Sequence, residues 1–202
     1  MKKIVPQKNL HEFFYQEIQS ILAQEPDSID PAASFYLVNL LSTIYQKNET
    51  QQSVINFFDE PLALLLARAH HSNDPEERFT LLKHLGDRAL YISGFFGDSL
   101  GQSAVDLDYY MAMGGTAYRS LSSISKEKPR QKNLSELFQS LAAHFAQLVD
   151  IISQISEASG ITKNEDLLRL YERWIHTKSS RLLQKLKDQG IDPLEQHKKI
   201  LH

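Results

Sequence analysis

The segment that decides the fold is residues 86–121, GDRALYISGFFGDSLGQSAVDLDYYMAMGGTAYRSL. It contains six of the chain's eight glycines, together with four aspartates and four tyrosines, and its apolar residues recur at helical spacing. A glycine inside a helix costs about 1 kcal/mol relative to alanine. Gly94, Gly97 and Gly101 therefore indicate that the helix breaks there, that another backbone packs closely, or that a ligand lies against them.

A continuous helix through this segment would carry two stripes of side chains. The first is apolar, and we expect it to face the core: Leu81, Leu85, Ala89, Ile92, Phe96, Leu100, Ala104 and Leu107. The second would face a close neighbour, a cavity or water, and combines glycines with polar residues: Asp87, Tyr91, Gly94, Asp98, Gly101, Val105 and Asp108. A break near Gly94 and Gly97 would destroy this alignment.

Three interpretations of the second stripe stay open. Helices pack closely through the small residues, with Asp98 capping a new helix; or a ligand pocket lies there; or the segment is a hinge. Ligand pockets combine apolar walls with a few convergent polar groups. The candidate pocket residues are Asp87, Tyr91, Gly94, Gly97, Asp98, Gly101, Asp106, Tyr109, Tyr110 and His144.

His144 lies on a long helix predicted from Asn133 or Ser135 to about Ala158. Its stripe is otherwise apolar, with Leu137, Leu141, Leu148, Ile151 and Ile155. A buried neutral imidazole needs a hydrogen-bond partner for at least one nitrogen. We expect a core histidine bonded to a tyrosine or an aspartate, and a ligand-binding or catalytic role is the alternative.

Composition predicts one globular domain spanning residues 1–202, since 42% of the residues are apolar and 23% are charged. A net charge of −3 gives no nucleic-acid footprint, and the absence of cysteine excludes disulfides and cysteine-based metal sites. The longest apolar run, residues 61–67, is too short to span a bilayer, and MKKIVPQKN does not read as a secretory signal. We therefore expect a bacterial cytoplasmic protein.

The remaining segments predict further helices and no strands. They cover residues 9–25, Pro31 to about Gln46, 61–71 after an Asp59 cap, a helix opened by Asp74 and Pro75, Asn164 to Gln189, and a short one at the end. The helix at 61–71 is apolar almost all round and is expected in the middle of the bundle. Gly114 and Gly115 are expected to interrupt the central segment. The prediction is an all-α fold, a single bundle of seven or eight helices with a central Gly/Asp/Tyr-rich helix.

Recognisable catalytic and metal-binding motifs are absent. Glu-x-x-His pairs, which place metal ligands on one helix face, do not occur, and no metal or cofactor is predicted. Phosphate-loop, dinucleotide-binding and Gly-x-Ser-x-Gly patterns are also missing. On the last long helix, aromatic residues give way to Lys178, Arg181 and Lys185 along one line. This pattern favours a helix whose basic end leaves the core; an anionic ligand or acidic partner is the alternative.

The sequence LGDRALYISGFFGDSL, followed by DYYMAMGGTAY, resembles a family of uncharacterised bacterial all-helical proteins. This likeness covers residues 80–121 and implies no known activity. Gly97, Asp98 and Gly101 also resemble the Gly-Asp-x-x-Gly-Gly pattern of the heme oxygenase fold, although Gln102 replaces its last glycine. That likeness implies a tetrapyrrole ligand with His11 as the iron ligand.

Two function classes follow from these patterns. The first is a non-enzymatic interaction or binding module, which self-associates if the glycine stripe packs on a second copy. The second is a small-molecule pocket protein or enzyme, with a tetrapyrrole as one ligand. Neither nucleic acid nor a membrane is expected as a partner.

Overall fold

The computed structural model describes residues 10–24, 29–49, 60–96, 107–127, 129–158, 170, 174–175 and 177–188. Every regular element in these ranges is a helix, and the helices pack against one another, which confirms the predicted all-α bundle. The helices are α1 (Leu10–Leu22), α2 (Pro31–Glu49), α4 (Leu62–His71), α5 (Pro75–Phe95), α7 (Leu107–Lys126), the short 3-10 turn η2 (Pro129–Gln131), α8 (Lys132–Ala143), α9 (Phe145–Ala158) and α11 (Ser180–Asp188).

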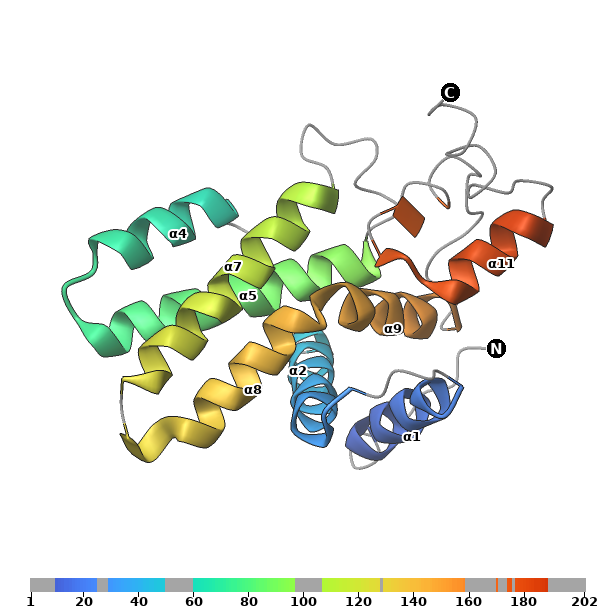
Figure 1. The fold of residues 1–202 in the computed structure, drawn as a ribbon, viewed down its shortest axis with the longest axis horizontal. Helices are drawn as coiled ribbons and strands as arrows, with labels where there is room; N and C mark the ends of the chain where they lie inside the picture. Colours follow the sequence, from blue (N-terminus) through green and yellow to red (C-terminus); the bar gives the residue numbers. More distant parts are fainter. Residues whose placement is uncertain are drawn as a thin grey trace, which may run out of the picture.

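Helix α5 lies at the centre of the molecule, between α4, α7 and α9 (Figure 1). Its start follows the prediction: the Asp74 side chain accepts a hydrogen bond from the Glu76 backbone N–H, and Pro75 occupies the first turn. Every residue from Leu85 to Phe95 is buried. Because this part of α5 is surrounded by other helices, its polar side chains are buried between them and not exposed to solvent.

Helix α4 lies at the edge of the molecule, so its predicted central position is wrong (Figure 1). Only Leu62, Leu65 and Ala69 are buried, and 54% of Leu64 is exposed. The helix packs on α5 through one face. Helix α4 therefore leaves some of its apolar side chains, such as Leu64, exposed to solvent.

The central segment is not one helix. Helix α5 ends at Phe95, and α7 begins at Leu107, so the expected continuous stripes end with α5. The predicted interruption at Gly114 and Gly115 is also wrong, because α7 continues through both. A Cβ at Gly114 would collide with the Phe145 ring and approach Ala89 Cβ to 2.9 Å. The missing side chain is therefore what lets α7 pack closely on α5 and α9.

Two other predicted helices contain breaks. The segment expected to run unbroken to Ala158 divides at His144 into α8 and α9, and neither Asn133 nor Ser135 caps it. Ser135 is instead buried and exchanges hydrogen bonds with Ser122 of α7. The segment expected as one helix up to Gln189 is interrupted before α11, where Lys178 adopts a positive φ of 54°.

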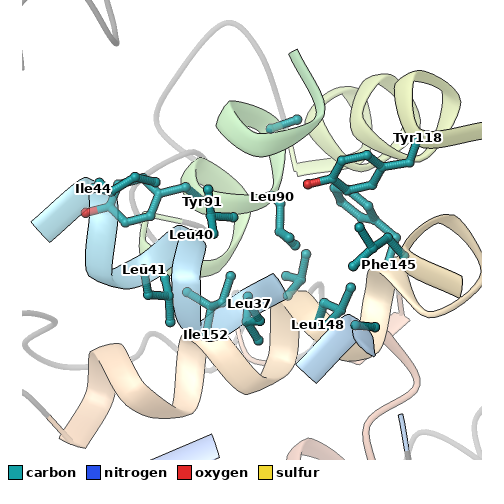
Figure 2. Packing of buried hydrophobic residues seen from close by; sticks show 14 of the residues in the cluster. Leu37, Leu40, Leu41, Ile44, Leu90, Tyr91, Tyr118, Phe145, Leu148 and Ile152 are labelled. Carbon is teal, nitrogen blue, oxygen red and sulfur yellow. The ribbon is translucent and has the colours of Figure 1, made fainter. Parts of the chain in front are cut away.

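The main core is built by α1, α2, α4, α5, α7, α8 and α9, with α4 contributing Leu62, Leu65 and Ala69. Helix α1 buries the face predicted from its spacing, with Leu10, Phe14, Ile18 and Ile21. Figure 2 shows labelled core side chains from α2, α5, α7 and α9: Leu37, Leu40, Leu41, Ile44, Leu90, Tyr91, Tyr118, Phe145, Leu148 and Ile152. A smaller core holds Trp174 with Leu170, Leu182 and Leu186.

Candidate functional site

The Asp87 carboxylate is the centre of a polar cluster inside the main core. Asp87 is 6% exposed, and its Oδ1 accepts hydrogen bonds from the Tyr36 hydroxyl at 2.6 Å and the Tyr118 hydroxyl at 2.8 Å. Its Oδ2 accepts from Lys83 Nζ at 2.7 Å. These contacts join α2, α5 and α7 through one side chain, and we call Asp87, Tyr36, Tyr118 and Lys83 the Asp87 cluster.

Local sequence explains how α5 accommodates this cluster. Lys83 and Asp87 are four residues apart and therefore share one helix face. A Cβ at Gly86 would lie 2.6 Å from Tyr118 Cε1, so the glycine is what admits the tyrosine ring. The Tyr118 ring also stacks on Phe138, with 5.9 Å between ring centroids, which fixes the direction of its hydroxyl.

Both phenols of the cluster remain protonated at neutral pH. Burial raises the pKa of Tyr36, and the adjacent negative charge of Asp87 raises it further. Burial and the same carboxylate raise the pKa of Tyr118 well above its ordinary value. The two hydroxyls are therefore hydrogen-bond donors of fixed direction over the physiological range.

A cavity of about 370 Å³ adjoins the cluster between α2 and α5, and we call it the Asp87 cavity. Its walls combine apolar side chains with polar ones: Tyr36, Asn39, Leu40, Thr43, Ile44, Thr80, Lys83, His84 and Asp87. The Lys83 side chain is 43% exposed, and its Nζ lies 5.2 Å from the centroid of the Tyr36 ring. The buried carboxylate thus holds a solvent-accessible ammonium group at the cavity.

Among the predicted site residues, Asp87 alone borders this cavity within the described part of the chain. Tyr91 is buried against Phe95, with ring centroids 4.7 Å apart, and Tyr109 and Tyr110 are partly buried at the start of α7. The other predicted residues on the central segment, Gly97, Asp98, Gly101 and Asp106, lie outside the described residues.

Gly94 serves close packing between helices of this chain. A Cβ there would lie 2.5 Å from Ile152 Cβ, on α9. Gly86 and Gly114 likewise face Tyr118 and Phe145. The first interpretation of the glycines, close packing, therefore describes all three of these positions.

Within the described part of the chain, His144 bonds to neither a tyrosine nor an aspartate, so that prediction is wrong. The residue is half-buried at the break between α8 and α9, and its Nδ1 lies 3.0 Å from the Ser140 carbonyl oxygen. A carbonyl only accepts, so Nδ1 carries the proton. The break turns the backbone at His144, which is why its neighbours differ from those of an uninterrupted helix.

His11, the residue implied by the heme oxygenase likeness, lies on the exposed face of α1. Its Nε2 is 3.3 Å from Asn39 Oδ1, and its ring meets Phe35 edge-on at 5.8 Å. Gly97, Asp98 and Gly101 lie outside the described residues. The tetrapyrrole alternative stays a prediction.

A second polar cluster joins α9 to α11. Arg181 Nη2 lies 3.0 Å from Asp150 Oδ1, and Arg181 Nη1 lies 3.0 Å from Glu157 Oε2. Lys185 Nζ lies 2.8 Å from the same Glu157 oxygen. The basic end of this helix therefore packs on α9, which corrects the expectation that it leaves the core; its acidic partners belong to the same chain.

We call Asp150, Glu157, Arg181 and Lys185 the Asp150 cluster. In this cluster, burial and the neighbouring charges shift the pKa values of Glu157 and Arg181 in opposite directions. Burial raises the pKa of Glu157, but the Lys185 hydrogen bond and the positive charges of Arg181 and Lys185 outweigh it, so that pKa lies below its ordinary value. Burial lowers the pKa of Arg181, and the charges of Asp150 and Glu157 outweigh that effect. The ion pairs therefore favour the charged forms of Glu157 and Arg181.

Sequence reasoning missed Tyr36, Tyr118 and Lys83. The spacing of Lys83 and Asp87 was a usable local signal, because oppositely charged residues four apart on a helix commonly pair. Tyr36 and Tyr118 are 51 and 31 residues from Asp87, so only the packing of the helices reveals their contacts.

Comparison of the chain with protein-family models, with curated proteins and with solved structures finds no match. None of the described helices combines the length and apolar character that crossing a membrane requires. Within the same ranges, no three histidine, aspartate or glutamate side chains gather where they could hold a metal ion. Functional inference therefore depends on the geometry of the cavities and clusters themselves.

Proposed function

We propose that this protein is a non-enzymatic binding module that takes a small molecule into the Asp87 cavity. One observation carries the proposal: Asp87 is nearly buried and accepts three hydrogen bonds from its own chain, yet it borders a cavity of about 370 Å³. Known ligand pockets have volumes of about 300–1,000 Å³ and combine apolar walls with a few fixed polar groups.

The protonation states of the cluster favour binding over catalysis. A general acid or base works best when its pKa lies near the operating pH. The pKa values of Tyr36 and Tyr118 are both raised away from neutrality, and both hydroxyls donate to Asp87. Such groups supply rigid walls and fixed dipoles, which reduce the entropy lost when a ligand binds.

The chemistry of the cavity favours a ligand with a hydrogen-bond acceptor on an apolar body. The Lys83 ammonium has three N–H donors, of which one serves Asp87. Leu40 and Ile44 supply apolar wall, and the Thr43 hydroxyl lies on the same helix. An acceptor group would bond to Lys83 while the body of the molecule covers the two aliphatic side chains.

Protein-observed NMR with a panel of small aromatic amides, acids and alcohols tests this proposal. Binding should shift the backbone amide signals of residues 39–44 and 80–87 in a saturable manner. Leu40→Trp should fill the cavity and abolish these shifts, while Leu64→Trp, on the exposed face of α4, should leave them unchanged. The absence of saturable shifts at residues 39–44 and 80–87, or shifts there that survive Leu40→Trp in a folded protein, would contradict the proposal.

Self-association, the other expectation from the sequence, stays a prediction. It followed from a glycine stripe that needs a close neighbour, and Gly86, Gly94 and Gly114 meet side chains of the same chain. These contacts account for the three glycines within a single copy. Light scattering of the purified protein measures the mass directly.

A further inference from the structure

A second cavity, of about 610 Å³, opens between the end of α1, the first turns of α9 and the beginning of α11. We call it the α9–α11 cavity. Part of its wall is formed by apolar side chains, those of Ile21, Ala143 and Ala146. Nitrogen-containing side chains also line it, those of His144, Lys178 and Arg181. It is separate from the Asp87 cavity and shares none of its residues.

The one carboxylate at this cavity, Asp150, is already satisfied within the described chain. Its Oδ1 accepts from Arg181 Nη2 at 3.0 Å, and its Oδ2 accepts from Ser179 Oγ at 2.9 Å and Gln154 Nε2 at 3.1 Å. Its side chain is 4% exposed. The charge that remains available to a ligand is therefore positive, and Lys178 carries it.

Lys178 occupies an unfavourable backbone conformation at the edge of this cavity. It is the one non-glycine residue with positive φ among the described residues, at 54°. Glycine adopts that conformation more readily than a residue with a side chain, so the lysine is present despite a conformational cost. Its Nζ lies 4.4 Å from the centroid of the Trp174 ring, which positions the ammonium without neutralising it.

His144 contributes a second nitrogen. Its Nδ1 is committed to the Ser140 carbonyl oxygen at 3.0 Å, which leaves Nε2 as the ring nitrogen for a ligand in the cavity. With the ring proton on Nδ1, Nε2 of the neutral ring is a hydrogen-bond acceptor and takes a donor group of the ligand. Lys178 therefore offers a charged donor to a ligand in this cavity, and His144 offers a neutral acceptor from a different element.

We propose that the α9–α11 cavity binds a small molecule with an anionic head group, a phosphate or a carboxylate, which contacts Lys178, while His144 Nε2 accepts from a donor group of the ligand. The apolar part of the ligand packs on Ile21, Ala143 and Ala146. This site is independent of the Asp87 cavity, so either proposal stands if the other fails.

Trp174 provides the test, because it is the chain's only tryptophan and its ring contacts Lys178. Phenyl phosphate, benzoate and phenol are titrated at constant ionic strength while tryptophan fluorescence and, independently, binding heat are measured. Saturable binding of phenyl phosphate or benzoate, and none of phenol, is expected, and the tighter of the two identifies the head group. No saturable binding, or equal binding of phenol, would overturn the proposal.

Substitution of Lys178 separates a ligand-binding role from a structural one. Lys178→Met should weaken binding of the anion about tenfold, since a charge-assisted contact is lost. The matched control is Lys132→Met. Lys132 pairs with Glu136 on an exposed face of α8, so this variant should bind the anion as tightly as the parent protein. Lys178→Gly relieves the positive φ and should raise the melting temperature while weakening binding. A variant that binds phenyl phosphate as tightly as the parent protein would show that Lys178 serves only the local fold.

Discussion

Asp87 and Asp150 are both nearly buried, with 6% and 3% of the whole residue exposed, but the hydrogen-bond donors around their carboxylates differ. Two phenols and one lysine surround Asp87 at the meeting of α2, α5 and α7. A guanidinium, a hydroxyl and an amide surround Asp150, where α11 joins α9. The first cluster relies mainly on neutral donors inside the main core; the second relies on ion pairs near the surface.

This difference predicts different responses to the same perturbation. Hydrogen bonds from neutral phenols are little affected by salt, whereas ion pairs with exposed partners are screened. Glu157 and Lys185 of the Asp150 cluster have side chains 25% and 37% exposed. The centre of the bundle should therefore behave as one rigid unit, and the attachment of α11 should respond to conditions.

Asp87→Ala should have the largest effect. It removes the acceptor of two buried hydroxyls and the partner of Lys83, and uncompensated buried polar groups of this kind cost about 3–5 kcal/mol. Urea unfolding followed by circular dichroism measures the loss. Asp188→Ala is the matched control, because that exposed aspartate accepts from Gln184 alone among the described residues and should change stability by less than about 0.5 kcal/mol.

Asp150→Ala should cost about 2 kcal/mol, less than Asp87→Ala, because Arg181 keeps Glu157 as a partner. The loss should be local. Trp174 fluorescence should report separation of α11 from α9 at a lower urea concentration than the loss of helical signal. If both probes shift together, the two clusters belong to one cooperative unit and the contrast between them is wrong.

Two glycine substitutions outside both clusters test how closely the helices pack. Gly94→Ala places a methyl group 2.5 Å from Ile152 Cβ and should destabilise the protein by about 1–2 kcal/mol. Gly115→Ala, whose nearest neighbour is the Arg119 guanidinium at 3.6 Å, should stabilise α7 by up to about 1 kcal/mol. Melting temperatures of the two variants should move in opposite directions.

The smallest expected effects are those of pH, and they have opposite signs in the two clusters. The folded-state pKa of Glu157 is lowered, so its contribution is present above the ordinary value of 4.5 and is lost as the pH falls through the folded pKa. The pKa values of Tyr36 and Tyr118 are raised, so their contribution is present below 10.0 and is lost as the pH rises above it.

Fluorescence of Trp174 and circular dichroism, recorded from acid to alkaline pH, should therefore change at opposite ends of the scale. Acid should loosen α11 first, and alkali should weaken the whole bundle. The Tyr36→Phe variant should flatten the alkaline limb without changing the acid one, and loss of helical signal before the fluorescence change in acid would contradict this assignment.

Much of the fold was accessible from local sequence. The spacing of Leu10, Phe14, Ile18 and Ile21 gave one buried face of α1, and Asp74 with Pro75 marked the start of α5. These features depend on residues within a few turns of one another. Local chemistry was sufficient for them because the signal and the feature that it specifies lie within the same few turns.

The errors arose where tertiary contacts outweigh local preference. Gly114 and Gly115 suggested a break, but α7 continues through both, and Phe145 packs closely against Gly114. His144 and Lys178 interrupt predicted helices through backbone turns that spacing alone does not reveal. Of the site, Asp87 was identified from its stripe; Tyr36 and Tyr118 reach it from distant helices, so their role follows only from the packing.

The most direct test of the central claim, that Asp87 is held by two protonated phenols beside a ligand cavity, is a pH titration of tyrosine ring carbons by NMR. The Cζ signals of Tyr36 and Tyr118 should keep their protonated positions well above about pH 10, where free tyrosine titrates. Titration of either residue together with free tyrosine would show that its hydroxyl is solvated and that the Asp87 cluster does not form.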